Sequence, residues 1–113
     1  MVRDDHLGWL QEFYLLHCDG DWEHSYGFSI ENVDNPGWLV KFDLADTKLS
    51  LAAFAGVDEQ RSDADWVICY KEDERFVDSG GALNLTEILS IFRRWAEANL
   101  QPGESPWLPP TAA

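Results

Sequence analysis

The stretch 26–44, YGFSIENVDNPGWLVKFDL, decides the fold, because apolar and polar side chains alternate in it on both sides of a turn. The turn is Asp34-Asn35-Pro36-Gly37, in which proline fixes φ and glycine permits a positive φ. A period of two places alternate side chains on opposite faces of a strand. The stretch therefore predicts an antiparallel hairpin with a polar face and an apolar face, the latter formed by Tyr26, Phe28, Ile30, Trp38, Val40, Phe42 and Leu44.

The segment after the hairpin predicts further short elements. Residues 48–51 indicate a short strand, residues 52–55 a helical turn, and residues 58–65 a charged loop. Residues 66–71 are rich in aromatic and β-branched side chains, which favours a strand, and residues 75–78 a return strand. The run Ser79-Gly80-Gly81 then breaks the pattern.

A helix is predicted on each side of these strands. Asp4 or Asp5 can cap the first, over residues 6–17, and Gly20 supplies the left-handed position after it. Asn84 and Glu87 predict a capping box for the second helix, which runs to Leu100. The apolar stripe of the first helix includes Leu7, Leu10, Phe13 or Tyr14, and His17, broadened by Trp9 and Leu16; that of the second comprises Leu85, Ile88, Leu89, Phe92, Trp95 and Ala96.

Together these elements predict an α+β fold: an antiparallel β-meander of four to five strands, flanked by an N-terminal and a C-terminal helix packed on one face. We expect a single domain over residues 1–100. Residues 101–113 form a Pro-rich tail that cannot continue the helix, so we expect an extended arm or a disordered end there. Within it, Trp107 is expected to pack back onto the domain. Trp22, Trp38, Trp66 and Trp95 are expected to fill the core.

The charge of the chain is strongly negative. Among 113 residues, 21 Asp and Glu oppose 8 Lys and Arg, giving a formal net charge of −13. Such a field repels nucleic acid and anionic membranes and attracts a basic protein. We therefore expect a protein partner, no nucleic acid and no membrane. Two cysteines, no signal peptide and no apolar run of about 18 residues favour a cytoplasmic protein with free thiols.

The densest polar cluster is the run from Cys18 to His24, CDGDWEH. Thiolate, imidazole and carboxylate groups are all metal ligands, but the spacing fits neither a calcium loop nor a zinc site. We favour a turn with caps, and we expect no cofactor and no metal. His24 and His17 lack an oriented nucleophile nearby in the sequence, so catalysis is not favoured either.

Several segments resemble the immunity protein 53 family of bacterial toxin systems. The resemblance covers about residues 7–98, and its most distinctive part is the run from Cys18 to His24, which continues through Ser25-Tyr26-Gly27. It extends to Trp9-Leu10-Gln11, Tyr14, Asp34-Asn35-Pro36-Gly37-Trp38, Arg61-Ser62, Asp65-Trp66, Asn84-Leu85-Thr86-Glu87-Ile88-Leu89 and Trp95. The resemblance implies an immunity protein, encoded beside a toxin, that protects the producing cell and is not an enzyme.

These inferences combine into one hypothesis, an antitoxin that binds a cognate toxin through an acidic surface. The acidity suits a toxin with a basic cleft, such as a nuclease domain. The alternative is a small-ligand or metal-dependent enzyme that uses the cluster from Cys18 to His24. The oligomeric state stays open. Our candidate partner-binding residues are Asp19, Asp21, Trp22, Glu23, Asp43 and Asp46, with burial in the core as the structural alternative for Trp22.

Overall fold

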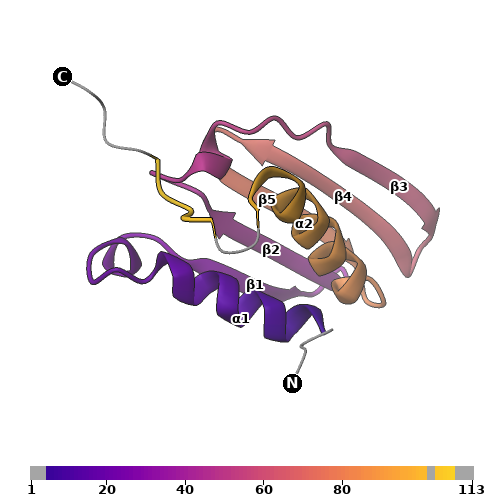
Figure 1. Cartoon of the computed structure of the whole chain (residues 1–113). Helices are drawn as coiled ribbons and strands as arrows, with labels where there is room; N and C mark the ends of the chain where they lie inside the picture. Colours follow the sequence, from indigo (N-terminus) through magenta and orange to yellow (C-terminus); the bar gives the residue numbers. More distant parts are fainter. Residues whose placement is uncertain (1–4, 102–103, 109–113) are drawn as a thin grey trace.

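A computed structural model describes residues 5–101 and 104–108, in which two α-helices pack on a five-stranded sheet (Figure 1). In chain order the elements are α1 (His6–His17), the 3₁₀ turn η1 (Trp22–His24), β1 (Phe28–Val33), β2 (Gly37–Asp43), the 3₁₀ turn η2 (Lys48–Ser50), β3 (Val57–Ser62), β4 (Asp65–Glu72), β5 (Arg75–Gly81) and α2 (Leu85–Asn99).

The sheet has the strand order β1-β2-β5-β4-β3, and all neighbouring strands are antiparallel. The predicted hairpin is β1–β2, with Phe28 opposite Phe42 and Ile30 opposite Val40. The strands β3, β4 and β5 form a meander, and pairing of β5 with β2 joins it to the hairpin. The predicted α+β class with an antiparallel sheet and two flanking helices is confirmed.

Both helices lie on the same face of the sheet (Figure 1). The core between them is largely aromatic: the Phe92 ring lies 4.3 Å from that of Phe42 and 4.8 Å from that of Phe76, centroid to centroid. All three side chains are fully buried. Because each ring buries about 150–250 Å², a small core of this kind suffices for a domain of this length.

Three predicted elements between the hairpin and β4 are wrong. Residues 48–51 contain a 3₁₀ turn instead of a strand, residues 52–55 contain no helix, and most of the predicted loop 58–65 is strand β3. The strand β3 was missed because it is an edge strand whose side chains after Val57 are exposed and polar, so that no apolar alternation marks it. The strand β4 was predicted correctly.

Glycines lie at the end of β5 and at the start of β2, where the sequence predicted turns. The strand β5 continues through Ser79-Gly80-Gly81, because it pairs there with β2 and β4. A Cβ on Gly80 would lie 2.8 Å from Cδ1 of Ile88 and 3.1 Å from the carbonyl oxygen of Trp66, so a larger residue there would require α2 or the Ile88 side chain to shift. Gly37 has no positive φ, contrary to our expectation; a Cβ there would collide with the carbonyl oxygen of Gly80. At Gly20 the expected positive φ is confirmed, at 94°.

The predicted capping box at Asn84 is wrong, because its side chain makes no capping bond to the backbone of α2. Its Oδ1 accepts the backbone N–H of Trp66 at 3.1 Å, and its Nδ2 donates to Asp65 and Glu87. Arg61 donates to the same two carboxylates at 3.0 and 2.5 Å. This network ties the β3–β4 hairpin to the start of α2. For the first helix, the expected cap by Asp5 is confirmed, and Asp4 lies outside the described residues.

The stripe of α1 that faces the sheet is narrower than predicted. Leu10, Phe13 and His17 are buried, but Leu7 and Leu16 are more than half exposed. On a helix with 3.6 residues per turn, Leu10, Phe13 and His17 lie within an arc of about 60°, and Leu7 and Leu16 lie about 60° beyond its two ends. The predicted stripe of α2 is confirmed by the packing of its six residues in or against the core.

The described part of the C-terminal tail packs against the domain, so the expectation of an extended arm or a disordered end is wrong for residues 104–108. Glu104 pairs with Lys48 at 2.7 Å, and the backbone of Trp107 bridges to Thr47. The expected return of Trp107 is thereby confirmed. Residues 102–103 and 109–113 of the predicted tail lie outside the described residues. Within the described ranges, no helix has the length and apolarity needed to span a bilayer.

Candidate functional site

The connection between α1 and β1 is organised by two of the candidate carboxylates. Oδ1 of Asp19 accepts the backbone N–H groups of Asp21 and Trp22, both at 2.9 Å. Glu23 reaches back to the N–H groups of Asp19 and Gly20, at 3.0 and 2.8 Å. The bonds from Trp22 and then Asp21 lower the pKa of the Asp19 carboxyl. The loop is thus held in one shape with its carboxylates exposed or half-exposed.

Trp22 anchors this loop to the body of the protein. The side chain is only 4% exposed, and its indole N–H donates to the carbonyl of Ala45 at 3.1 Å. The indole lies 5.0 Å from the ring of His17 and 5.9 Å from that of Phe28. The structural alternative for Trp22, burial in the core, is what the structure shows. Any part it has in partner binding is therefore through the position of the loop.

The other candidate carboxylates lie beside this loop. Oδ2 of Asp43 accepts the backbone N–H of Gly27 at 3.0 Å, and its Oδ1 pairs with Arg75 at 2.9 Å. Asp46 is exposed at a positive φ of 65°, directly after the carbonyl that Trp22 contacts. The fold therefore brings Asp43 and Asp46 to the same end of the sheet as the 18–24 loop.

The turn between β4 and β5 adds three acidic residues that the sequence reasoning missed. The carbonyl of Glu74 accepts the N–H of Leu44 at 2.7 Å, which places the turn next to Asp43. Glu72, Asp73 and Glu74 line a shallow hollow of about 480 Å³ together with Asp43 and Tyr26. The sequence did not reveal these residues because their position depends on strand pairing: the start of β5 pairs with the ends of both β2 and β4. We call this region, at left in Figure 1, the acidic end; it comprises Asp19, Asp21, Glu23, Asp43, Asp46, Glu72, Asp73 and Glu74.

The cluster from Cys18 to His24 does not converge on a common centre. The Cys18 thiol donates to the carbonyl of Tyr14 at 3.4 Å, while the His24 side chain is exposed. Over residues 5–101 and 104–108, no three His, Cys, Asp or Glu side chains are grouped so that they could hold a metal ion. The geometry of the loop is that of a capped turn.

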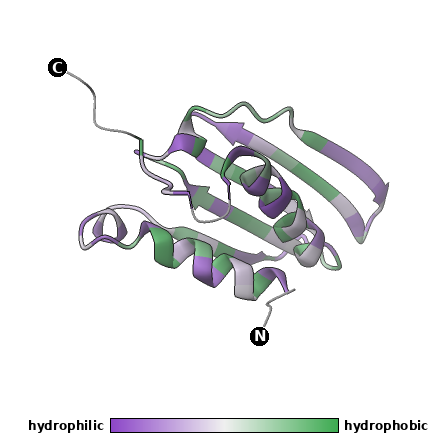
Figure 2. Cartoon of the chain, in the orientation of Figure 1, coloured by the Kyte–Doolittle hydropathy of each residue, from purple (hydrophilic) through white to green (hydrophobic). Residues whose placement is uncertain are grey.

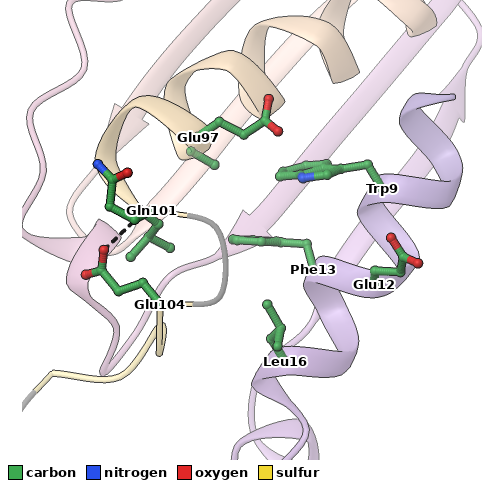
Figure 3. Close-up of a pocket in the computed structure, with 9 residues that line it drawn as sticks. Trp9, Glu12, Phe13, Leu16, Glu97, Gln101 and Glu104 are labelled. Carbon is green, nitrogen blue, oxygen red and sulfur yellow. Dashed lines mark hydrogen bonds between the residues drawn. The ribbon is translucent and has the colours of Figure 1, made fainter. Parts of the chain in front are cut away.

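A groove of about 320 Å³ lies between α1 and α2 (Figure 3). Trp9, Phe13 and Leu16 of α1 form one wall, and Ala96 and Leu100 form the other. Glutamates stand at its border, but they are engaged within the chain: Glu97 pairs with Arg93 at 3.4 Å and Glu104 with Lys48. We interpret the groove as the seam between the two helices.

The titratable side chains of His17, Asp78 and Cys69 are buried. Burial lowers the pKa of His17, although Nδ1 makes a 2.8 Å hydrogen bond with the carbonyl of Phe13. Asp78 is fully buried beneath α2, and neither of its oxygens has a well-aligned hydrogen bond within the described residues. Burial raises its pKa to about 8, and the thiol of Cys69, opposite it on β4, only partly offsets this. Asp78 is therefore largely protonated at neutral pH.

Comparison with known proteins gives one finding. A family model described as immunity protein 53 matches residues 7–97, most of the chain. Neither the comparison with curated proteins nor that with solved structures gives a match. The match runs from Leu7 in α1 to Glu97 in α2 and includes every residue of the acidic end.

Proposed function

Since the chain belongs to the immunity protein 53 family, we propose that it neutralises a cognate toxin domain by binding it directly in the cytoplasm. The observation that carries the proposal is the acidic end, where eight carboxylate side chains come together from three segments of the chain. Among the described residues, Arg75 is ion-paired with Asp43 of this set, and the Lys71 ammonium donates to the backbone carbonyl of Asp73. The surplus of negative charge is complementary to a basic cleft, as in a nuclease domain.

Complementary charge and oriented carboxylates would both favour the formation of such a complex. Complementary charge speeds the encounter of two proteins, with association rates up to about 10⁸–10⁹ M⁻¹s⁻¹ at low salt. The loop carboxylates are already oriented by backbone N–H groups, so little conformational entropy is lost when a cation approaches them. Binding over the toxin's active site would exclude its substrate without any catalytic step by this chain.

Co-expression with the toxin encoded beside it tests the proposal. We expect the wild-type protein to restore growth of cells that produce the toxin and to copurify with it in a fixed ratio. Asp21→Lys combined with Asp46→Lys should slow association at least several-fold, since both side chains are exposed. Absence of both rescue and copurification would refute the proposal.

A second experiment separates neutralisation by binding from the enzyme alternative. His24→Ala removes the imidazole of the cluster from Cys18 to His24 but leaves the acidic end intact, and the His24 side chain is exposed. We expect this variant to protect as well as the wild type. Protection that is lost while toxin binding is retained, or stoichiometric metal in the purified protein, would favour the enzyme.

A further inference from the structure

The face of the sheet turned away from the helices carries an apolar patch. Residues on alternate positions of the three central strands point to this face, because their neighbours Val40, Val67 and Phe76 point into the core. We define the open-face patch as Leu39 of β2, Trp66, Ile68 and Tyr70 of β4, and Val77 of β5. Tyr70 is exposed, Leu39, Trp66 and Ile68 are half-buried, and Val77 is buried beneath its neighbours.

Observations of two kinds support this placement. None of the five side chains belongs to the core cluster or packs against it. Polar side chains that strand alternation places on this face also contact one another: Gln60 donates to Asp58 at 3.1 Å, and Arg75 donates to Asp43 at 2.9 Å. Our expectation that Trp66 fills the core is therefore wrong. The sequence correctly predicted β4 as a strand. Because both faces of this strand are apolar, the sequence did not reveal which face the helices cover.

The distribution of polarity over this face resembles that of a protein interface. An antiparallel sheet that exposes one face to water usually has polar side chains there. Here the edge strands are mainly polar, with Ser29 and Glu31 on β1 and Asp58 and Gln60 on β3, and the central strands add Lys41 opposite Val77 and Ser79 between Leu39 and Ile68. The strand β4 is the one whose side chains on this face are mainly apolar. Figure 2 shows the hydrophilic β3 beside the hydrophobic middle of β4, which contributes residues to both faces of the sheet. An apolar centre within a polar rim is the usual anatomy of a binding surface.

We propose that the open-face patch is the docking surface for the toxin, an inference that rests on the proposed function. The partner is a protein with an apolar contact area bordered by Lys and Arg. The rim of the patch determines this chemistry: its acidic residues are Glu31, Asp43, Asp58 and Glu72, whereas its bases are Lys41 and Arg75, the latter paired with Asp43.

Charge also argues against a second copy of this chain on the patch. Two copies would bring together two acidic rims, each on a chain with a net charge of −13. In contrast, Asp43 and Glu72 belong both to this rim and to the acidic end. A basic partner can therefore cover the patch and the acidic end as one continuous surface, with aromatic side chains at the centre, where binding energy concentrates.

The test compares two apolar-to-lysine substitutions, measured by calorimetry with the toxin domain encoded beside this chain. Tyr70→Lys alters the patch at a side chain that is 45% exposed; the control Leu15→Lys alters α1 at one that is 69% exposed. We expect Tyr70→Lys to weaken binding by about 30-fold or more, and Leu15→Lys by less than about threefold. Equal effects, or a loss confined to Leu15→Lys, would overturn the inference.

Two charge-reversal variants and a control test the docking surface if Tyr70→Lys fails to fold. Glu31→Lys and Asp58→Lys reverse exposed rim charges, and Glu97→Lys reverses an exposed charge on the helix layer. We expect the rim variants to lower the association rate at low salt several-fold, and the control to leave it within about twofold. Unchanged rates for both rim variants would refute the docking surface.

The remaining outcomes separate this inference from the proposed function. If the wild type binds the toxin but only acidic-end variants lose affinity, the docking surface is wrong and the function stands. If the wild type does not bind at all, both are refuted. A wild-type dimer in light scattering that Tyr70→Lys converts to a monomer would assign the patch to self-association instead.

Discussion

The two faces of the sheet are built from the same strands but differ in what covers them. On one face the rings of Phe42, Phe76 and Phe92 are fully buried under the two helices. On the other, Trp66 and Tyr70 are partly exposed, with no helix over them. Each central strand therefore contributes to both a core and an open surface. Apolar content alone therefore does not separate residues that stabilise the fold from residues that are available to a partner.

The largest expected difference between the faces is in stability. Phe92→Ala should lower the free energy of unfolding by about 3–5 kcal/mol, because it leaves a cavity among close-packed rings. Tyr70→Ala, on the open face, should cost no more than about 1 kcal/mol. Urea unfolding monitored by circular dichroism measures both. Similar losses for the two variants would mean that the open face also stabilises the fold.

Asp78 is a fully buried acid on the covered face, and it predicts that the stability of the protein depends on pH. Its pKa is raised to about 8 in the folded protein, so between about pH 4 and 8 the folded state binds more protons at this site than the unfolded state. The contribution of Asp78 to stability is therefore present at low pH and is lost as the pH rises to about 8. Asp78→Asn should remove this loss and gain about 1–3 kcal/mol over the wild type at pH 8.

Thermal unfolding at pH 5 and pH 8 checks this prediction for both proteins. The difference in melting temperature between variant and wild type should be larger at pH 8 than at pH 5. A variant that is less stable by the same amount at both values would show that Asp78 does not titrate differently in the two states.

A smaller effect is expected where the covered layer meets the acidic end. Trp22→Phe retains an aromatic ring but leaves the carbonyl of Ala45 without the indole donor, which should cost about 1–2 kcal/mol. The 18–24 loop should then exchange its amide protons faster, with α2 unchanged as the internal control. Unaltered exchange in the loop would show that Trp22 does not hold it.

The sequence predicted those parts of the fold in which local pattern and tertiary environment agree. The β1–β2 hairpin alternates because one of its faces is covered, and α2 shows its buried stripe plainly. The strand β3 lacked alternation because it is an exposed edge strand. The strand β5 was predicted too short because glycine normally weakens a strand, whereas here Gly80 faces Ile88 of α2 and Gly81 faces the backbone of Ala64. The return of the tail at Trp107 depends on contacts across the whole chain.

The candidate surface was predictable only in part. Asp19, Asp21 and Glu23 were evident as a cluster in the chain, and Asp43 and Asp46 lie beside them in the structure. Glu72, Asp73 and Glu74 join them only through strand pairing, which no local pattern reveals. The open-face patch was hidden because Trp66 and Ile68 have the composition of a core strand.

The most direct measurement is oxidative footprinting of aromatic side chains in the free protein and in its complex with the toxin domain. Tyr70 on the open face and Tyr14 on α1 are similarly exposed, at 45% and 38%, so each is a control for the other. We expect the toxin to protect Tyr70 and Trp66 strongly and to leave Tyr14 as reactive as in the free protein. Protection of Tyr14 with unchanged oxidation of Tyr70 would place the toxin on the helix layer and contradict the proposed docking surface.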